Sequence, residues 1–368
     1  MKLQNVLFIL GLLLFGPLAA QETVNSIFSQ MQQQVPLEMT LRTNLGQLLA
    51  STETEPAYQS AILSFTPQRA VRQVYGIKIR ARGKFRLQAC DFPPLKLNFS
   101  KSELEQRGMV PTYDKLKLVT HCLNDEDLGE EKLLREYIAY RLMEEIGPYS
   151  FRVQLVKIRY VDETGQLDGF ERYGFLIENT RELMNRLKGE EIEEGAYSPV
   201  TAFDQEATQM HAMFQYLIGN SDYSVPVLRN IKLLRRSIDG RLVPVGYDFD
   251  FAGFVDAPYA LPATHLGQLA IRQRIYLGTY AEDAALQRTI EHFLTKQKAL
   301  LSIIDDTRAL SATYRRDLRE YILTFYEQME LIRDNGYQNI YRYLRQEHPT
   351  AVPDGGAAAD YQVETTRW

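Results

Sequence analysis

Hydrophobic and polar residues alternate in several short runs over the first half of the chain, and this period of two is typical of half-buried strands. A single helix is predicted among them at 130–146, where the Gly147-Pro148 pair would end it. Several strands with one helix predict a first lobe built on an antiparallel sheet. The predicted strands lie at 72–88, 94–101, 115–122, 151–161 and 172–178.

The second half shows the helical period instead, with apolar residues three and four positions apart. Helices are predicted at 203–218, 282–305 and 311–345. The predicted fold class is therefore α+β, in which a sheet lobe with one helix is followed by a mainly helical lobe. The predicted organisation is an export signal at 1–20, a lead-in segment at 21–70, the sheet lobe at 71–190, the helical lobe at 191–348 and a disordered tail at 349–368.

The chain begins like a secretory signal, with Lys2, an apolar run at 6–15 and small residues up to Ala20. The run is shorter than the ~20 residues that span a membrane, so no membrane segment is expected after cleavage. The protein is expected to be exported to the periplasm, the cell envelope or the exterior. Exported chains favour disulfides, and a strand hairpin centred near Gln106 would bring Cys90 opposite Cys122. Two small buried apolar side chains remain the alternative.

The charge and the histidine spacing exclude several function classes. Forty-two basic and 47 acidic residues give a net charge of −5, which argues against a dedicated nucleic-acid binder. The five histidines show no zinc-type spacing, and two cysteines cannot form a structural zinc site. No G-x-S-x-G motif of the serine hydrolases is present.

Oxygen-bearing side chains gather around a predicted hairpin at 230–248. Asp239-Gly240 predicts a two-residue turn, which would place Asn230 opposite Phe249, between Asp248 and Asp250. Carboxylate and amide oxygens suit Mg²⁺, which proteins hold together with substrate phosphates.

Asp222 lies just before this hairpin, and a free carboxylate there could orient a hydroxyl nucleophile. In a regular ladder Asn230 would face away from the two aspartates, so a bulge at Pro244 is expected. The alternative is an ordinary hairpin with polar ends.

Seven short motifs follow one another in this order over 71–253: R-A-R-G-K-F-R, P-P-L-K-L-N-F, L-L-R-E-Y-I-A-Y-R-L, Y-G-F-L-I-E, G-N-S-D, R-N-I-K-L-L and P-V-G-Y-D-F-D. Together they resemble the CotH-type secreted and spore-coat kinase-like family. The resemblance implies a kinase-like fold that transfers phosphate from ATP or another nucleoside triphosphate, with Mg²⁺, to a protein or glycan hydroxyl.

By this resemblance Asp222 is the catalytic-loop aspartate, Asn230 and Asp248 hold the metal, and Asp250 is a possible further ligand. The lysine that contacts the phosphates is either Lys96 or Lys117, and solvated strand lysines are the alternative for both.

Two further residues are candidates for nucleotide binding. Glu136 lies on an apolar helix face and is expected to have a cationic partner, because a buried lone charge is costly. A lysine partner of Glu136 would match the kinase arrangement. The alternative is a salt bridge from Glu136 to Arg135 or Arg141 without a catalytic role. Arg82, beside Gly83, has the side chain suited to phosphate oxygens.

The chain also departs from active kinases. It has no G-x-G-x-x-G loop, the interval from Asp222 to Asn230 is longer than in ordinary protein kinases, and Arg229 stands where the family often has histidine. An inactive kinase-like module that binds or scaffolds in the cell envelope is therefore the second hypothesis. The acceptor and the oligomeric state stay open.

Overall fold

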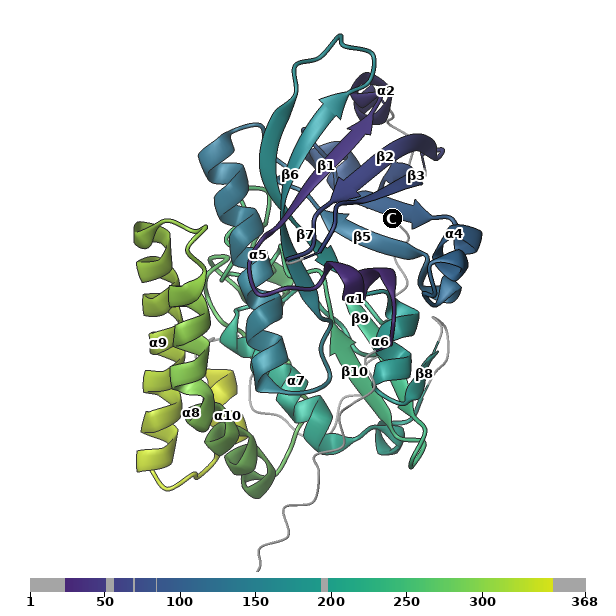
Figure 1. The fold of residues 1–368 in the computed structure, drawn as a ribbon. Coiled ribbons are helices and arrows are strands. Elements are labelled where there is room, and N and C mark those ends of the chain that lie inside the picture. Colours follow the sequence, from purple (N-terminus) through teal and green to yellow (C-terminus); the bar gives the residue numbers. More distant parts are fainter. Residues whose placement is uncertain (1–23, 51–55, 69, 84, 193–197, 347–368) are drawn as a thin grey trace, which may run out of the picture.

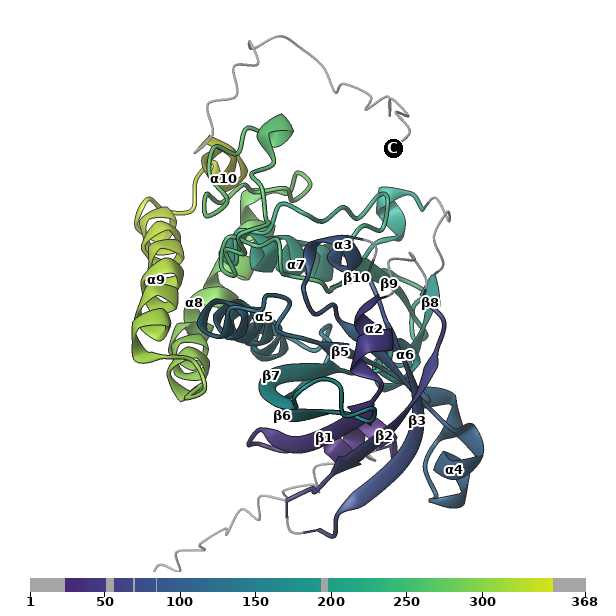
Figure 2. The same cartoon turned by 90° about the horizontal axis from the view of Figure 1, so that it is seen from above.

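The computed structural model describes residues 24–50, 56–68, 70–83, 85–192 and 198–346, and Figures 1 and 2 show it from two directions. The predicted export signal and tail lie outside these residues. The strands are β1 Leu37–Thr43, β2 Gln59–Phe65, β3 Gln73–Ala81, β4 Leu95–Phe99, β5 Lys115–Val119, β6 Val153–Asp162, β7 Phe170–Ile177, β8 Gly189–Ile192, β9 Ile231–Arg236 and β10 Leu242–Gly246. The helices are α1 Ile27–Met31, α2 Leu45–Ala50, α3 Arg86–Ala89, α4 Lys101–Gln106, α5 Glu126–Ile146, α6 Thr180–Arg186, α7 Gln205–Leu217, α8 Asp283–Asp306, α9 Ala312–Asp334 and α10 Ile340–Gln346.

Within the described residues, seven strands close into a barrel in the order β1-β2-β3-β4-β5-β7-β6. Neighbouring strands are antiparallel except β1 and β6, which run parallel. Burial alternates along β1, β3 and β4, so that one apolar row from each strand fills the interior. The predicted antiparallel sheet lobe is therefore a closed barrel with one parallel pair.

The segment 21–70, predicted as a lead-in, contributes β1 and β2 to this barrel. Its alternating pattern was present in L-E-M-T-L-R-T, but its parallel partner β6 lies more than 100 residues away in the sequence. The strand predicted at 72–88 ends earlier, at Ala81, and the turn of helix α3 follows it. That short helix carries a residue of the site described below.

Helix α5 lies between the barrel and the pair α8–α9 and packs on β7 and α8 (Figure 1). The Asp125 side chain caps its start by accepting from the Leu128 N–H at 2.9 Å, and the chain leaves the helix at Gly147. Gly129 in the first turns allows a close approach, since a Cβ there would lie 2.6 Å from the Leu123 carbonyl oxygen. The connection from β5 therefore runs directly against α5.

The helical part consists of α7 to α10, with α8 and α9 side by side on the outside of the molecule (Figure 2). Within it the β9–β10 hairpin pairs with β8, so the boundary predicted near residue 190 falls inside a strand of this small sheet. Among the residues described, no helix has the length and apolar character needed to traverse a bilayer.

Candidate functional site

The hairpin has a different register from the predicted one. Gly246 pairs with Ile231, and the Tyr247 N–H donates to the Asn230 carbonyl at 3.1 Å. Asn230 therefore lies beside Tyr247, and the prediction that it faces Phe249 is wrong by two residues.

The reason lies in the loop that closes the hairpin. The Arg236 N–H donates to the Arg241 carbonyl at 2.9 Å, so a loop of four residues, 237–240, lies between these two hydrogen-bonded residues. A type I′ turn needs positive φ at both central positions. Gly240 has φ +70°, whereas Asp239 stays outside the left-handed region and accepts from the Arg236 side chain at 2.9 Å. The Asp-Gly pair thus marks a longer loop.

In a regular ladder the side chains of Asn230 and Asp248 would point to opposite faces of the hairpin. The backbone at the strand ends changes their directions, and no bulge is involved. Pro244 pairs regularly with Leu233, which contradicts the predicted bulge. Asn230 and Asp248 instead have left-handed backbones, with φ 53° and 62°. Asn and Asp tolerate this conformation better than most residues, and such positions often occur at ligand sites. Each of the two side chains thereby leaves the strand alternation.

Asp222 and Asn230 are joined directly. The Asn230 Nδ2 donates to the Asp222 carbonyl oxygen at 2.7 Å and to its carboxylate Oδ2 at 2.9 Å. Because the amide nitrogen is committed to Asp222, the Oδ1 oxygen of Asn230 is the atom that could ligate a cation. Arg229 adds an ion pair to Asp222 at 3.4 Å from its half-exposed side chain.

Asp248 belongs to the same cluster. Its backbone N–H donates to the Tyr140 hydroxyl at 2.8 Å, which ties it to α5. Burial raises the pKa of Asp222, and the negative charge of Asp248 raises it further, while Arg229 and Asn230 lower it. The negative charges of Asp222 and Asp248 therefore repel each other.

Lys117, on barrel strand β5, interacts with the charge of Asp248. Its Nζ lies 4.8 Å from the ring centroid of Tyr247, the residue before Asp248. Burial lowers the pKa of Lys117 to about 7, and Asp248 works against this shift. Three neighbouring positive charges lower the pKa further, namely those of Arg82, Lys232 and Lys96.

The cationic neighbours of Lys117 come from adjacent strands. Arg80, Lys96 and Lys117 are paired in register across β3, β4 and β5, on the face opposite the buried leucines. Lys96 thus lies beside Lys117, as the alternation predicted. The charges of Lys96 and Arg82 act on Lys117, and the charge of Lys117 interacts with that of Asp248.

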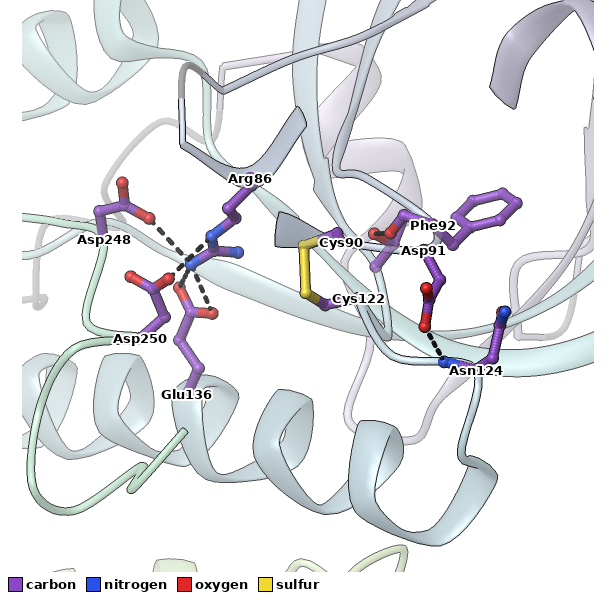
Figure 3. Close-up of a disulfide and its surroundings, with 10 residues drawn as sticks. Arg86, Cys90, Asp91, Phe92, Cys122, Asn124, Glu136, Asp248 and Asp250 are labelled. Atoms are coloured by element: carbon purple, nitrogen blue, oxygen red, sulfur yellow. Dashed lines mark hydrogen bonds and ion pairs between the residues drawn. A yellow bond between two sulfur atoms is a disulfide. The ribbon is translucent and has the colours of Figure 1, made fainter. Parts of the chain in front are cut away.

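Glu136 and Asp250 bind a residue that the sequence analysis did not single out. Arg86 Nη2 lies 3.1 Å from a Glu136 oxygen and 3.0 Å from Asp248 Oδ1, and its Nε donates to Asp250 Oδ2 at 2.9 Å. Figure 3 shows these three carboxylates around the one guanidinium. We call this group the Arg86 cluster. The expected lysine partner of Glu136 is thus an arginine, and Asp250 is an arginine partner.

Burial raises the pKa of Glu136 and of Asp250, and the charge of Arg86 works against the rise in both. A buried arginine cannot be recognised from local sequence, and Arg86 lies 50 residues from Glu136 and 162 from Asp248. Two features of the sequence could have pointed to Arg86. Arg86 is the last residue of the R-A-R-G-K-F-R motif, and the acidic side chains predicted to gather needed a cation.

The side chains present can supply part of a cation site. Among the described residues, no three or more His, Cys, Asp or Glu side chains are arranged to hold a metal ion. Asp248 offers one carboxylate, with one oxygen toward Arg86 and the other directed away (Figure 3). Asn230 offers its Oδ1. Since Mg²⁺ is commonly held by one or two protein oxygens plus phosphates, this donor set fits an ion that arrives with a nucleotide.

Cys90 and Cys122 form a disulfide (Figure 3). The predicted disulfide is therefore confirmed, and the alternative of two unbonded buried cysteines is wrong. It joins the end of α3 to the connection between β5 and α5.

No protein-family model matches this chain, and no curated protein matches it. It is similar to a solved structure described as the Helicobacter pylori proinflammatory kinase CtkA, with a TM-score of 0.36 and 8% identity. The match covers 62% of this chain and 92% of that chain. At this TM-score and identity, neither the fold class nor an activity nor a residue role of this chain is argued from the match.

Proposed function

We propose that the protein is a nucleotide- and Mg²⁺-dependent phosphotransferase of kinase-like fold that acts on a protein or glycan hydroxyl. The observation that supports this most is the hydrogen bond between Asn230 and Asp222, together with the electrostatic interactions of Asp248 with Asp222 and with Lys117, which lies far away in the chain. A cation beside a carboxylate pair is an arrangement suited to a metal-bound polyphosphate.

Each side chain has a definite part in this proposal. Lys117, whose charge is poorly solvated, would bind the phosphate oxygens, because an anion restores the interactions that burial removes. Asp248 and the Oδ1 of Asn230 would hold the magnesium, which when bound offsets charge on the phosphate oxygens. Arg82 and Lys96 would add positive charge around the polyphosphate.

Asp222 would receive the proton of the acceptor hydroxyl. The hydroxyl oxygen forms a bond to the terminal phosphorus while the bond from that phosphorus to the bridging oxygen breaks, and a nucleoside diphosphate leaves. The raised pKa of Asp222 improves the carboxylate as a proton acceptor. Its hydrogen bonds from Asn230 hold it in position.

The test is transfer of labelled phosphate from ATP to a mixture of exported proteins and glycans, or to the protein itself. Asp222→Asn should lower the transfer rate by about 10²- to 10⁴-fold, the usual contribution of a positioned acid–base group. Asp168→Asn, in the exposed connection between β6 and β7, is the matched control and should leave the rate unchanged. Equal rates in Asp222→Asn and the wild type would refute the assigned role.

The second candidate is a nucleotide-binding module without transfer. It is favoured by the ion pair between Arg229 and Asp222, because that contact and the bonds from Asn230 occupy both carboxylate oxygens. The Arg229 side chain is 50% exposed, so the pair is weak enough to exchange for a substrate hydroxyl. This candidate predicts nucleotide binding with no labelled product in the same assay.

A further inference from the structure

Arg86 connects parts of the molecule that carry different site residues. It lies on α3, in the connection between barrel strands β3 and β4, whereas Glu136 is on α5 and Asp248 follows β10. Its neighbour Phe85 packs edge-on against Phe251, with ring centroids 5.4 Å apart. The start of α3 thus contacts the segment that contains Asp248.

The disulfide lies one helical turn from Arg86. Cys90 ends α3 and its N–H donates to the Arg86 carbonyl at 3.0 Å. Cys122 lies in the connection that leads from the strand of Lys117 to the helix of Glu136. One covalent bond therefore links the helix that bears Arg86 to both of these elements (Figure 3).

Helix α3 has little else in its own structure to hold it. It is four residues long, its N-cap Phe85 makes no side-chain capping bond, and so short a helix is unstable in isolation. Its position must come from contacts outside it. These contacts include the Arg86 ion pairs, the Phe85 packing, the packing of the partly buried Leu87 against the barrel core and the disulfide. Beside the disulfide, the Phe92 N–H donates to the Cys122 carbonyl at 3.0 Å and the Asn124 N–H donates to Asp91 at 2.9 Å, and the S–S bond is the covalent member of this set.

Arg86 also determines which oxygen of Asp248 is available. It is the one guanidinium shared by three carboxylates, and the Asp248 side chain is 38% exposed while those of Glu136 and Asp250 are 4% and 6% exposed. Without Arg86 the three negative charges would repel, and Asp248, the most exposed, is the one able to move away. Its direction toward a ligand depends on Arg86.

We propose that Arg86 is a positioning residue for Asp248 and that the Cys90–Cys122 disulfide holds Arg86 in place, so that binding of a magnesium–nucleotide complex depends on the intact disulfide. This inference rests on the proposed function. Reduction by a small dithiol would break the S–S bond, give two cysteine thiols, and convert the dithiol to its own disulfide. The two electrons and two protons come from the dithiol.

The first measurement is independent of nucleotide. In arginine-labelled protein the Arg86 side-chain N–H is observed by NMR, and its signal is assigned from its loss in Arg86→Lys. Three carboxylate acceptors, two of them buried, should shift it and slow its exchange with water in the oxidised protein. The protection should be lost in Cys90→Ser/Cys122→Ser and in the wild type with dithiothreitol. Unchanged protection in both would overturn the tethering role of the disulfide.

The second measurement compares affinity for ATP with and without Mg²⁺. Cys90→Ser/Cys122→Ser and Arg86→Gln should each weaken binding of the magnesium complex by about 10- to 100-fold, as removal of groups that orient metal ligands does. Binding of ATP alone, through Lys117, should change much less, and Arg86→Lys should recover part of the loss. Arg107→Gln, an arginine in a surface pair with Glu103, is the control.

The outcomes separate the two proposals. Wild-type affinity for the magnesium complex in both variants would overturn the positioning role. A wild type that binds no nucleotide would refute the proposed function, and the positioning role in nucleotide binding with it, while the NMR signal would still decide whether the disulfide holds Arg86. If Arg86→Gln does not fold, the reduced wild type provides the same comparison.

Discussion

Two groups of charged side chains share Asp248. Negative charges outnumber positive ones in the Arg86 cluster, and positive charges outnumber negative ones around Lys117. In the Arg86 cluster one guanidinium serves three carboxylates through direct contacts of 2.9 to 3.1 Å. Around Lys117, three positive charges lower the lysine pKa and one carboxylate, Asp248, opposes them. The first group is held together by its own ion pairs, and the second would be relieved by an incoming anion. One site can thus combine ion pairs that hold its residues in place with an excess of positive charge that a bound anion would neutralise.

Of the substitutions considered, removal of Arg86 should change the free energy of unfolding most. Arg86→Met leaves three buried or half-buried carboxylates without their cation, and we expect the free energy of unfolding to fall by ~3–5 kcal/mol. Chemical denaturation at pH 7 measures it. The deficit should shrink as the pH falls, because protonation removes the charges that need Arg86.

Arg107→Met is the matched control for Arg86→Met. Its ion pair with Glu103 and its hydrogen bonds to Gln73 and the Val74 carbonyl are at the surface, so the substitution should cost about 1–2 kcal/mol. A deficit in Arg86→Met no larger than in this control would mean that the Arg86 cluster does not support the fold.

Removal of Lys117 should raise the free energy of unfolding, the opposite of the effect expected for Arg86. Because burial lowers its pKa to about 7, the folded protein tolerates the charged lysine poorly, and Lys117→Met should raise the free energy of unfolding by roughly 2 kcal/mol at pH 7. Between pH 7 and 10 the unfolded chain holds more protons on this lysine than the folded one, so raising the pH stabilises the wild type. The gap between the two proteins should therefore close over that range.

Lys157→Met provides the comparison, since this lysine is exposed on β6 in a surface pair with Glu171. Denaturation curves at pH 7 and pH 9.5 test both substitutions. A loss of stability in Lys117→Met at pH 7 would show that the lysine is favourably solvated or paired in the folded state.

The pH dependence of nucleotide affinity should be smaller and specific to Lys117. Above pH about 7 the free protein must take up a proton for Lys117 to bind phosphate in its charged form, so affinity should fall by up to about tenfold per pH unit. Calorimetry in buffers of different ionisation enthalpy measures the proton uptake. Lys117→Arg stays charged and should show neither the uptake nor the decline. Identical profiles for the two proteins would exclude Lys117 from the phosphate site.

The sequence predicted the local features of this site better than its long-range contacts. The alternation of L-K-L-N-F and K-L-K-L-V was enough to place Lys96 beside Lys117. The order of the residues around the hairpin predicted that Asp222 and Asn230 come together, and Asn230 donates to Asp222 at 2.9 Å. These features depend on strand period and short connections, which the sequence records directly.

What could not be predicted depends on geometry beyond the strand. The hairpin register changed by two residues because the backbone at Asp239 is not left-handed, and no residue pattern distinguishes that loop from a tight turn. Arg86 joins groups 50 to 164 residues away, so its role follows from the folded chain. The barrel closure likewise depends on the parallel pairing of β1 with β6.

The central claim is that a magnesium–nucleotide complex binds where Asp248 and Asn230 face Lys117. The most direct measurement is thermal unfolding of the wild type with ATP and Mg²⁺ together, with each alone, and with neither. At a ligand concentration of 100 times Kd, the account predicts a gain of about 2.7 kcal/mol for the complex, reduced in Asp248→Asn. An unfolding transition that stays the same under all four conditions, up to millimolar nucleotide, would contradict it.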